Sequence, residues 1–174
     1  MEWKLNMSKI STLKELYVDE LKDLWSANDQ MGKALTKILP QAKNTKLVTM
    51  LQASQRGIGK HTEMLKSLIG KHDDEVEKEH CKGMEGLCKE AIKHTIEEAP
   101  EDGPVLDAAI IAQYQRMTHY GITGFGTAMA FAQALKLDDD AKKLEASVKE
   151  MYNSDELMTE LAESAVNVSA ASKS

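Results

Sequence analysis

Apolar residues recur every three or four positions along nearly the whole chain, which is the spacing of amphipathic α-helices. Runs in which β-branched and polar residues alternate, as expected of a half-buried strand, are absent from the sequence. The prolines Pro40, Pro100 and Pro104 fall where a periodic stretch ends or restarts. Because proline clashes with the preceding helical turn, it marks the ends and first positions of helices. The pattern predicts an all-α chain.

The first two predicted helices are long. The first begins after Thr12, which forms a capping-box pattern with Glu15, and ends at Pro40. The second spans about residues 44–70 and ends at Gly70, a residue type common at helix C-termini. The short segment between them predicts an antiparallel helical hairpin.

A shorter and more polar third helix is predicted from Cys81 to Ile96. The fourth begins at Pro104 and continues to Leu135, and the fifth begins within the acidic run 138–140, which suits a helix N-terminus. A short connection joins the fourth and fifth helices. These two helices therefore form a second predicted hairpin.

Four long helices in two hairpins predict a four-helix bundle. The stretch between the hairpins, which contains the third helix, is long enough to return along the bundle, as in ferritin-like folds with one crossover. We expect one ferritin-like domain over residues 8–167, with an N-terminal extension at 1–7 and a flexible polar tail at 168–174.

Composition narrows the functional classes. A chain of 174 residues fits one domain, and its 28 acidic and 22 basic residues give a net charge of −6. The two signs are interspersed, so the chain lacks the basic stripe of a nucleic-acid binder. The sequence shows neither an apolar run of about 18 residues nor an N-terminal signal pattern. We therefore expect a cytoplasmic protein with no nucleic-acid or membrane partner.

Cys81 and Cys88 are the only cysteines. Seven positions on a helix place them on one face but two turns apart, too far for a disulfide, so we expect two reduced core thiols. With His80 they form the one soft-ligand cluster, which lacks the spacing of a zinc site. Four methionines are interpreted as core residues rather than copper ligands: Met84, Met117, Met129 and Met151.

Several short stretches carry a family resemblance. They are YVDELKDL at 17–24, CKGMEGL at 81–87, DAAIIA at 107–112, HY at 119–120 with GT at 126–127, and TELAE at 159–163. These stretches resemble the YciE/YciF family of ferritin-like bacterial stress proteins, over about residues 8–167. The resemblance implies a role in stress and, in typical members, a bundle core with carboxylates and histidines for a two-metal site.

This sequence departs from that ligand pattern. By the resemblance, the degenerate ligand positions are Asn28, Arg56, Gly59, Thr118 and Gly121, and one acid survives as Glu150. Asn28 offers a neutral oxygen, and Arg56 would add a permanent positive charge. None of the four long predicted helices carries the Glu-x-x-His spacing that dinuclear sites in such bundles use. We expect no catalytic residues, no cofactor and no metal.

An alternative keeps a distorted iron or manganese site, in a metal-binding carboxylate protein or an oxidase. Its candidate ligands are Glu85, His119, Glu150 and His61. For His119, which lies mid-helix beside Tyr120, the expectation is instead a buried histidine paired with a neighbour.

A second alternative is a bundle that binds a small molecule. Five glycines crowd the middle of the second and fourth helices: Gly57, Gly59, Gly121, Gly124 and Gly126. Each glycine costs a helix interior roughly 0.5–1 kcal/mol relative to alanine. Their clustering indicates either close helix contact or a cavity.

A homodimer is the expected assembly. Val18, Ile111, Tyr114 and Phe131 lie off the main apolar stripe of their helices. If they are exposed, they form an apolar patch of the kind that marks an interface. A two-fold dimer is the commonest closed arrangement that covers such a patch.

Overall fold

The structure, a computed structural model, describes residues 10–73 and 75–172. These described residues form helices and connecting segments without a strand, so the all-α prediction is confirmed. The helices are α1 Leu13–Ile38, η1 Leu39–Gln41, α2 Thr45–His72, α3 Lys82–Ile92, η2 Lys93–Glu97, α4 Gly103–Ala134, α5 Asp138–Leu161, η3 Ala162–Val166 and α6 Asn167–Ala171.

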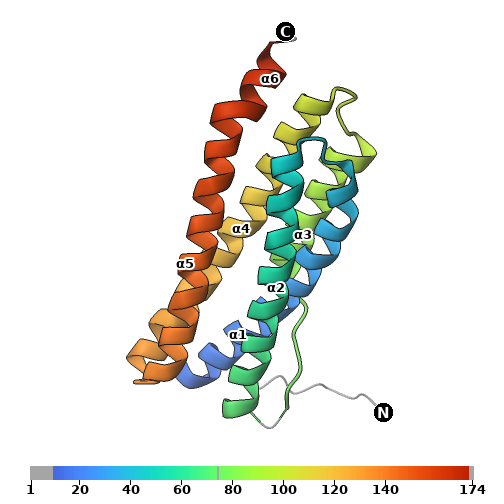
Figure 1. The fold of residues 1–174 in the computed structure, drawn as a ribbon. Coiled ribbons are helices and arrows are strands. Elements are labelled where there is room, and N and C mark those ends of the chain that lie inside the picture. Colours follow the sequence, from blue (N-terminus) through green and yellow to red (C-terminus); the bar gives the residue numbers. More distant parts are fainter. Residues whose placement is uncertain (1–9, 74, 173–174) are drawn as a thin grey trace, which may run out of the picture.

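The long helices form two antiparallel hairpins, α1 with α2 and α4 with α5 (Figure 1). The connection between them returns along the bundle and contains α3, which packs against α1 and α4. The crossover therefore puts α4 beside α1 and α5 beside α2, each antiparallel to its neighbour. This is the predicted ferritin-like arrangement.

Local sequence signals explain most helix ends. Glu15 N–H donates to Thr12 Oγ1 at 3.1 Å while the Glu15 carboxylate accepts from Thr12 N–H at 3.0 Å, which confirms the capping box. The predicted end of the second helix at Gly70 is wrong, because α2 continues to His72. Gly70 keeps a helical backbone, and its missing side chain admits Val76, whose methyl lies 3.3 Å from the Cβ position.

At the end of the bundle where α5 begins, one buried carboxylate joins three helices. Asp140 accepts hydrogen bonds from Tyr17 OH at 3.1 Å and from Lys71 Nζ at 2.6 Å, and its Oδ2 lies 2.5 Å from Nε2 of His72. The Asp140 side chain is fully buried. These contacts hold the start of α5 against α1 and the end of α2.

Both cysteines are free, but they do not share a helix. Cys81 precedes α3 as its N-cap residue and is buried, whereas Cys88 lies within α3 and is half-buried. The expectation of two reduced core thiols is confirmed, since Cys81 belongs to a core cluster and Cys88 packs against it, but their placement on one helix is wrong. The cause is local: the segment before α3 is extended, so the helix begins one residue after Cys81.

The structure describes the C-terminal end of the chain to residue 172 and the N-terminal end from residue 10. Residues 1–7, predicted as an extension, lie outside the described residues. At the other end, η3 and α6 continue the helix to Ala171, where the sequence predicts a flexible tail from 168.

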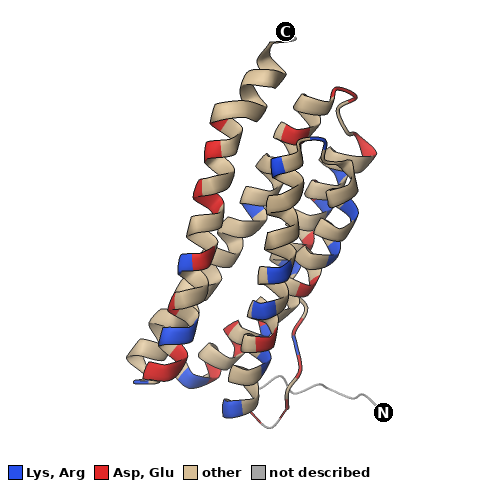
Figure 2. Cartoon of the chain, viewed as in Figure 1, with Lys and Arg blue, Asp and Glu red and all other residues tan. Residues whose placement is uncertain are grey.

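Charged side chains of both signs are interspersed over the helices (Figure 2). In the part of the chain that the structure describes, no helix has the combined length and apolar character of a membrane span.

The apolar residues expected at a dimer interface lie mostly inside the chain. Val18, Ile111 and Tyr114 are buried, and Phe131 is half-buried. The expectation that they form an exposed patch is therefore wrong. The helices that surround them, including α3 in the crossover, cover their faces of α1 and α4.

Candidate functional site

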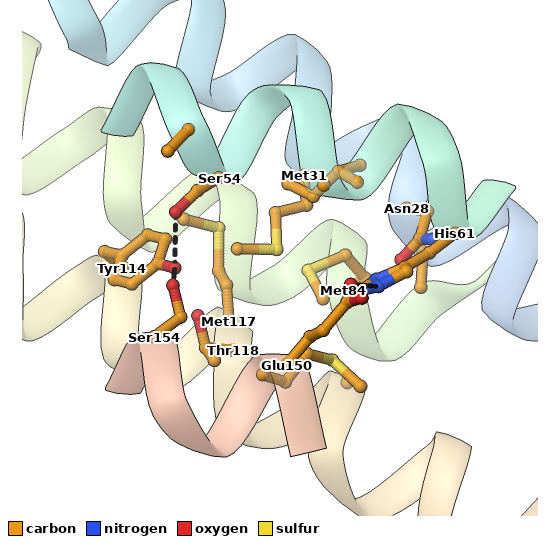
Figure 3. A pocket seen from close by; sticks show the side chains of 16 residues that line it. Asn28, Met31, Ser54, His61, Met84, Tyr114, Met117, Thr118, Glu150 and Ser154 are labelled. Carbon is orange, nitrogen blue, oxygen red and sulfur yellow. Dashed lines mark hydrogen bonds and ion pairs between the residues drawn. The ribbon is translucent and has the colours of Figure 1, made fainter. Parts of the chain in front are cut away.

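The centre of the bundle contains a cavity of about 180 Å³ between α1, α2, α4 and α5, with Met84 contributed by α3 (Figure 3). Five of the residues singled out from the sequence line it: Asn28, His61, Thr118, Gly121 and Glu150. They come from all four long helices. At the position along the bundle where the family resemblance implies a metal centre, this chain therefore has a cavity.

Two other candidates are not there. Arg56 and Gly59 are exposed and do not line the cavity. With 3.6 residues per turn, the face of α2 that lines the cavity carries Ser54, Gly57 and His61 instead. The expected positive charge at the bundle centre is therefore wrong, because Arg56 lies on the solvent side of α2.

Glu85 also lies away from the cavity. It occupies the first turn of α3, where it accepts from Lys89 and lies 2.6 Å from Nε2 of His80. The hydrogen bonds from Lys89 and then His80 lower the pKa of Glu85 to about 2. Glu85 is thus held in a surface ion pair.

His119 faces outward on α4. Its side chain is 58% exposed, and its Nε2 lies 2.8 Å from Oδ2 of Asp155 on α5. The prediction of a buried histidine is wrong, because this turn of α4 presents Met117 and Thr118 to the core instead. Of the four proposed metal ligands, the structure therefore brings together only the remaining two.

Those two, His61 and Glu150, join α2 to α5 at one end of the cavity. Nε2 of His61 lies 2.9 Å from one oxygen of Glu150, and Lys60 Nζ donates to the other at 3.0 Å. His61 is buried, while the Glu150 side chain is 49% exposed. The hydrogen bonds from His61 and then Lys60 hold the pKa of Glu150 below its ordinary value, so the carboxylate is ionised at neutral pH.

A chain of hydroxyl groups closes the opposite end. Tyr114 OH lies 2.7 Å from Ser54 Oγ and 3.3 Å from Ser154 Oγ (Figure 3). Ser54 donates its hydrogen to the Met50 carbonyl at 3.0 Å. It follows that Tyr114 donates to Ser54 and accepts from Ser154.

Neither serine was predicted from the sequence as a cavity residue. Their signal was the inward stripe of each helix: Ser54 lies between Leu51 and Ile58, and Ser154 lies between Met151 and Met158 at the same spacing. A polar residue inside such a stripe predicts a hydrogen bond within the core.

Between the two ends, two residues of the lining carry a buried polar atom without a partner. Nδ2 of Asn28 and Oγ1 of Thr118 find no hydrogen-bond partner among the described residues. Asn28 is 8% exposed and Thr118 is 4% exposed. A buried polar group left without a partner costs about 1–3 kcal/mol. Two residues of the cavity lining therefore carry hydrogen-bonding capacity that the described part of the protein does not use.

The rest of the wall is largely thioether. Met31, Met84, Met117 and Met151 all line the cavity, whereas Met129 packs at the edge of the other core cluster. Methionine side chains are flexible and polarisable, so they adapt to the shape of what they contact.

The glycines that crowd these helices have different roles. A Cβ at Gly124 would lie 2.5 Å from Leu24 Cδ2, so this glycine allows close contact between α4 and α1. Gly57 lines the cavity, and a Cβ there would meet nothing within 4 Å. Both explanations raised from the sequence therefore apply, at different positions.

The residues present do not fit a dinuclear metal centre. Such a centre requires several carboxylates and histidines from facing helices. Glu150 is the one carboxylate that lines the cavity among the described residues, and both of its oxygens already accept hydrogen bonds. The described part of the chain contains no group of three or more His, Cys, Asp or Glu placed to hold a metal ion.

The comparisons with known proteins agree with the fold. Residues 12–171 match the family described as a domain of unknown function, DUF892. Protein YciF of Escherichia coli K12 is 30% identical over 165 residues, which cover 94% of this chain and 98% of that protein.

Two solved structures are similar over most of their length. The crystal structure of the E. coli stress protein YciF has a TM-score of 0.83 at 30% identity, covering 91% of this chain and 99% of that chain. YcfI from Rhodopseudomonas palustris has a TM-score of 0.82 at 32% identity, covering 88% of this chain and 96% of that chain. With a family match that spans nearly all of its residues, the chain belongs to the DUF892 family and is a YciF-like helical bundle.

Proposed function

We propose that this chain is a stress-associated, YciF-type protein that acts by binding and not by metal chemistry, with the central cavity as its binding site. The stress association is carried over from the relative that is described as a stress protein. The proposal also places the protein in the cytoplasm, in keeping with its two free cysteines.

The observation that carries the proposal is the state of Glu150. A dinuclear centre in such a bundle needs several carboxylates, but Glu150 is the one carboxylate of the described lining, and it is already paired with His61 and Lys60. The facing positions Asn28 and Thr118 are neutral, so nothing in the described lining balances the charge of two divalent cations.

Thiol chemistry is also disfavoured. Burial raises the pKa of Cys88 to about 11, with a smaller contribution from Cys81. Burial likewise raises the pKa of Cys81. Both thiols are therefore protonated at neutral pH, and a protonated thiol is a poor nucleophile.

Elemental analysis tests the proposal. Untagged protein grown with added iron and manganese should contain far less than one metal ion per chain. Two iron or manganese ions per chain would overturn the proposal and favour the distorted metal site.

A variant with restored carboxylates calibrates this measurement. Asn28→Glu, Ser54→Glu and Thr118→Glu together place acids on three helices at the cavity, and metal uptake should rise. The matched control, Arg56→Glu with Gly59→Glu, adds acids on the exposed face of α2 and should leave metal content unchanged.

A further inference from the structure

We propose that the ligand of the central cavity is a small uncharged molecule with an apolar, preferably aromatic, body and one hydroxyl or carbonyl oxygen that accepts a hydrogen bond from the Asn28 amide. The inference rests on the proposed function, in that it takes the cavity as the binding site. Size, polarity, charge and wall chemistry each support it.

Cavity size limits the ligand to a small molecule. A volume of about 180 Å³ slightly exceeds that of an engineered apolar cavity of about 150 Å³ that binds benzene. A single aromatic ring with one short polar substituent fits these dimensions. A nucleotide is too large for this volume.

The unpartnered polar atoms select a ligand with an oxygen. Nδ2 of Asn28 on α1 is a donor, and Oγ1 of Thr118 on α4 can donate or accept. Both side chains are more than nine-tenths buried and line the same cavity. A hydroxyl or carbonyl oxygen between them satisfies groups that otherwise carry a desolvation cost.

Charge balance excludes an ionic ligand. Glu150 is the charged residue of the described lining, and Lys60 and His61 already compensate it. An ammonium or carboxylate entering the cavity would lose its hydration and find no free counter-ion.

Thioether walls favour an aromatic body. Met31, Met84 and Met117 lie around the cavity (Figure 3) and Met151 also lines it, so sulfur can contact the edge of a ring there. The Glu150 side chain is 49% exposed, so this part of the lining borders solvent.

Methionine-methyl NMR tests the inference. The probes are benzyl alcohol, benzene and benzoate, titrated into protein labelled with ¹³C at its methionine methyl groups. Benzyl alcohol should shift the four cavity methionines in a saturable manner and leave Met129 unchanged. Benzene should bind more weakly, and benzoate about tenfold more weakly or not at all.

Two pairs of variants localise the binding. Gly57→Leu should fill the cavity and abolish binding, while Gly59→Leu, on the exposed face of the same helix, should not change it. Asn28→Leu should weaken benzyl alcohol about fivefold to tenfold without weakening benzene. Thr118→Val should act in the same direction and serves as the second variant.

Three results would overturn the inference: equal affinity for benzyl alcohol and benzene, tighter binding of benzoate, or no shift with any probe. Metal content separates these failures from a failure of the proposed function. If the protein contains no metal and binds none of the probes, the proposed ligand is wrong, while the proposal of a metal-free centre stands.

Discussion

Nε2 of His61 lies 2.9 Å from Oε2 of Glu150, so the one acid of the described cavity lining ties α2 to α5. In a metal-binding relative of this architecture, such residues would point at cations. Here they point at each other, and the space beside them is lined by methionines and hydroxyl groups. The same helices thus enclose a cavity whose described lining has a single carboxylate.

Replacing the unpartnered polar groups should stabilise the protein. Asn28→Leu removes a buried amide with an unpaired donor and fills similar volume, so the free energy of unfolding should rise by about 1–2 kcal/mol. Urea unfolding with and without benzyl alcohol is the measurement. Wild-type protein should gain more stability from the probe than the variant does, and a destabilised Asn28→Leu protein would contradict the idea that the amide lacks a partner.

The glycine at the start of α3 should be intolerant of a side chain. A Cβ at Gly83 would lie 2.8 Å from the Tyr120 ring, whose hydroxyl donates to Asp23 at 3.1 Å. Gly83→Ala should therefore displace Tyr120 and lower the free energy of unfolding by about 1–3 kcal/mol. Gly86→Ala, three residues along the same helix with open space at its Cβ, is the control and should be neutral or slightly stabilising.

This contact also explains the stretch CKGMEGL, which carries much of the family resemblance. Cys81 caps α3 by accepting from Met84 N–H at 3.4 Å, and its sulfur lies 3.0 Å from Tyr120 OH. The cysteine and the first glycine therefore fit one tyrosine of α4. If Gly83→Ala proves as stable as Gly86→Ala, this packing account is wrong.

The free energy of unfolding should fall at low pH as Asp140 becomes protonated. Burial alone would raise the pKa of Asp140, but the hydrogen bonds from Lys71 and His72 outweigh it and hold this pKa below its ordinary value. A folded pKa below the unfolded one means that the contribution is complete above the unfolded value, about 3.9, and disappears as pH falls through the folded value.

Asp140→Asn should accordingly cost about 2–3 kcal/mol at pH 7, since it removes the negative charge and one of the two oxygens that pair with Lys71 and His72. The difference from wild type should shrink below about pH 4. Urea unfolding at pH 7, 5 and 3.5 measures it, with exposed Asp139→Asn as the control. A difference independent of pH would show that the charge of Asp140 is not what matters.

A homodimer remains a prediction, but the exposed apolar residues that could form its interface are not the ones predicted from the sequence. Tyr152 and Leu157 on α5 are 56% and 46% exposed, and pairing of α5 with a second copy would cover them. Light scattering should give twice the chain mass of 19.3 kDa, and Tyr152→Ser with Leu157→Ser should halve it. A wild-type mass that stays at the single-chain value as concentration rises would exclude the dimer.

Helix ends were predictable because their chemistry is local: Thr12 with Glu15 and the acidic start of α5 act within a few residues. The inward face of α2 was not. Around Gly57 and Gly59 the apolar pattern is weak, and a shift of two positions exchanges Ser54 for Arg56 as the residue at the centre. The cavity itself depends on the distance between four helices, which no local pattern encodes.

The hydrogen bond from Tyr17 to Asp140 joins residues 123 positions apart in the chain. Each hairpin can form from local contacts, but this bond exists only once the crossover has brought the second hairpin against the first. We therefore expect this bond to form late in folding, after the two hairpins have met. Its loss should then accelerate unfolding and leave the folding rate nearly unchanged, so we expect this end of the bundle to set how long the native protein persists once formed.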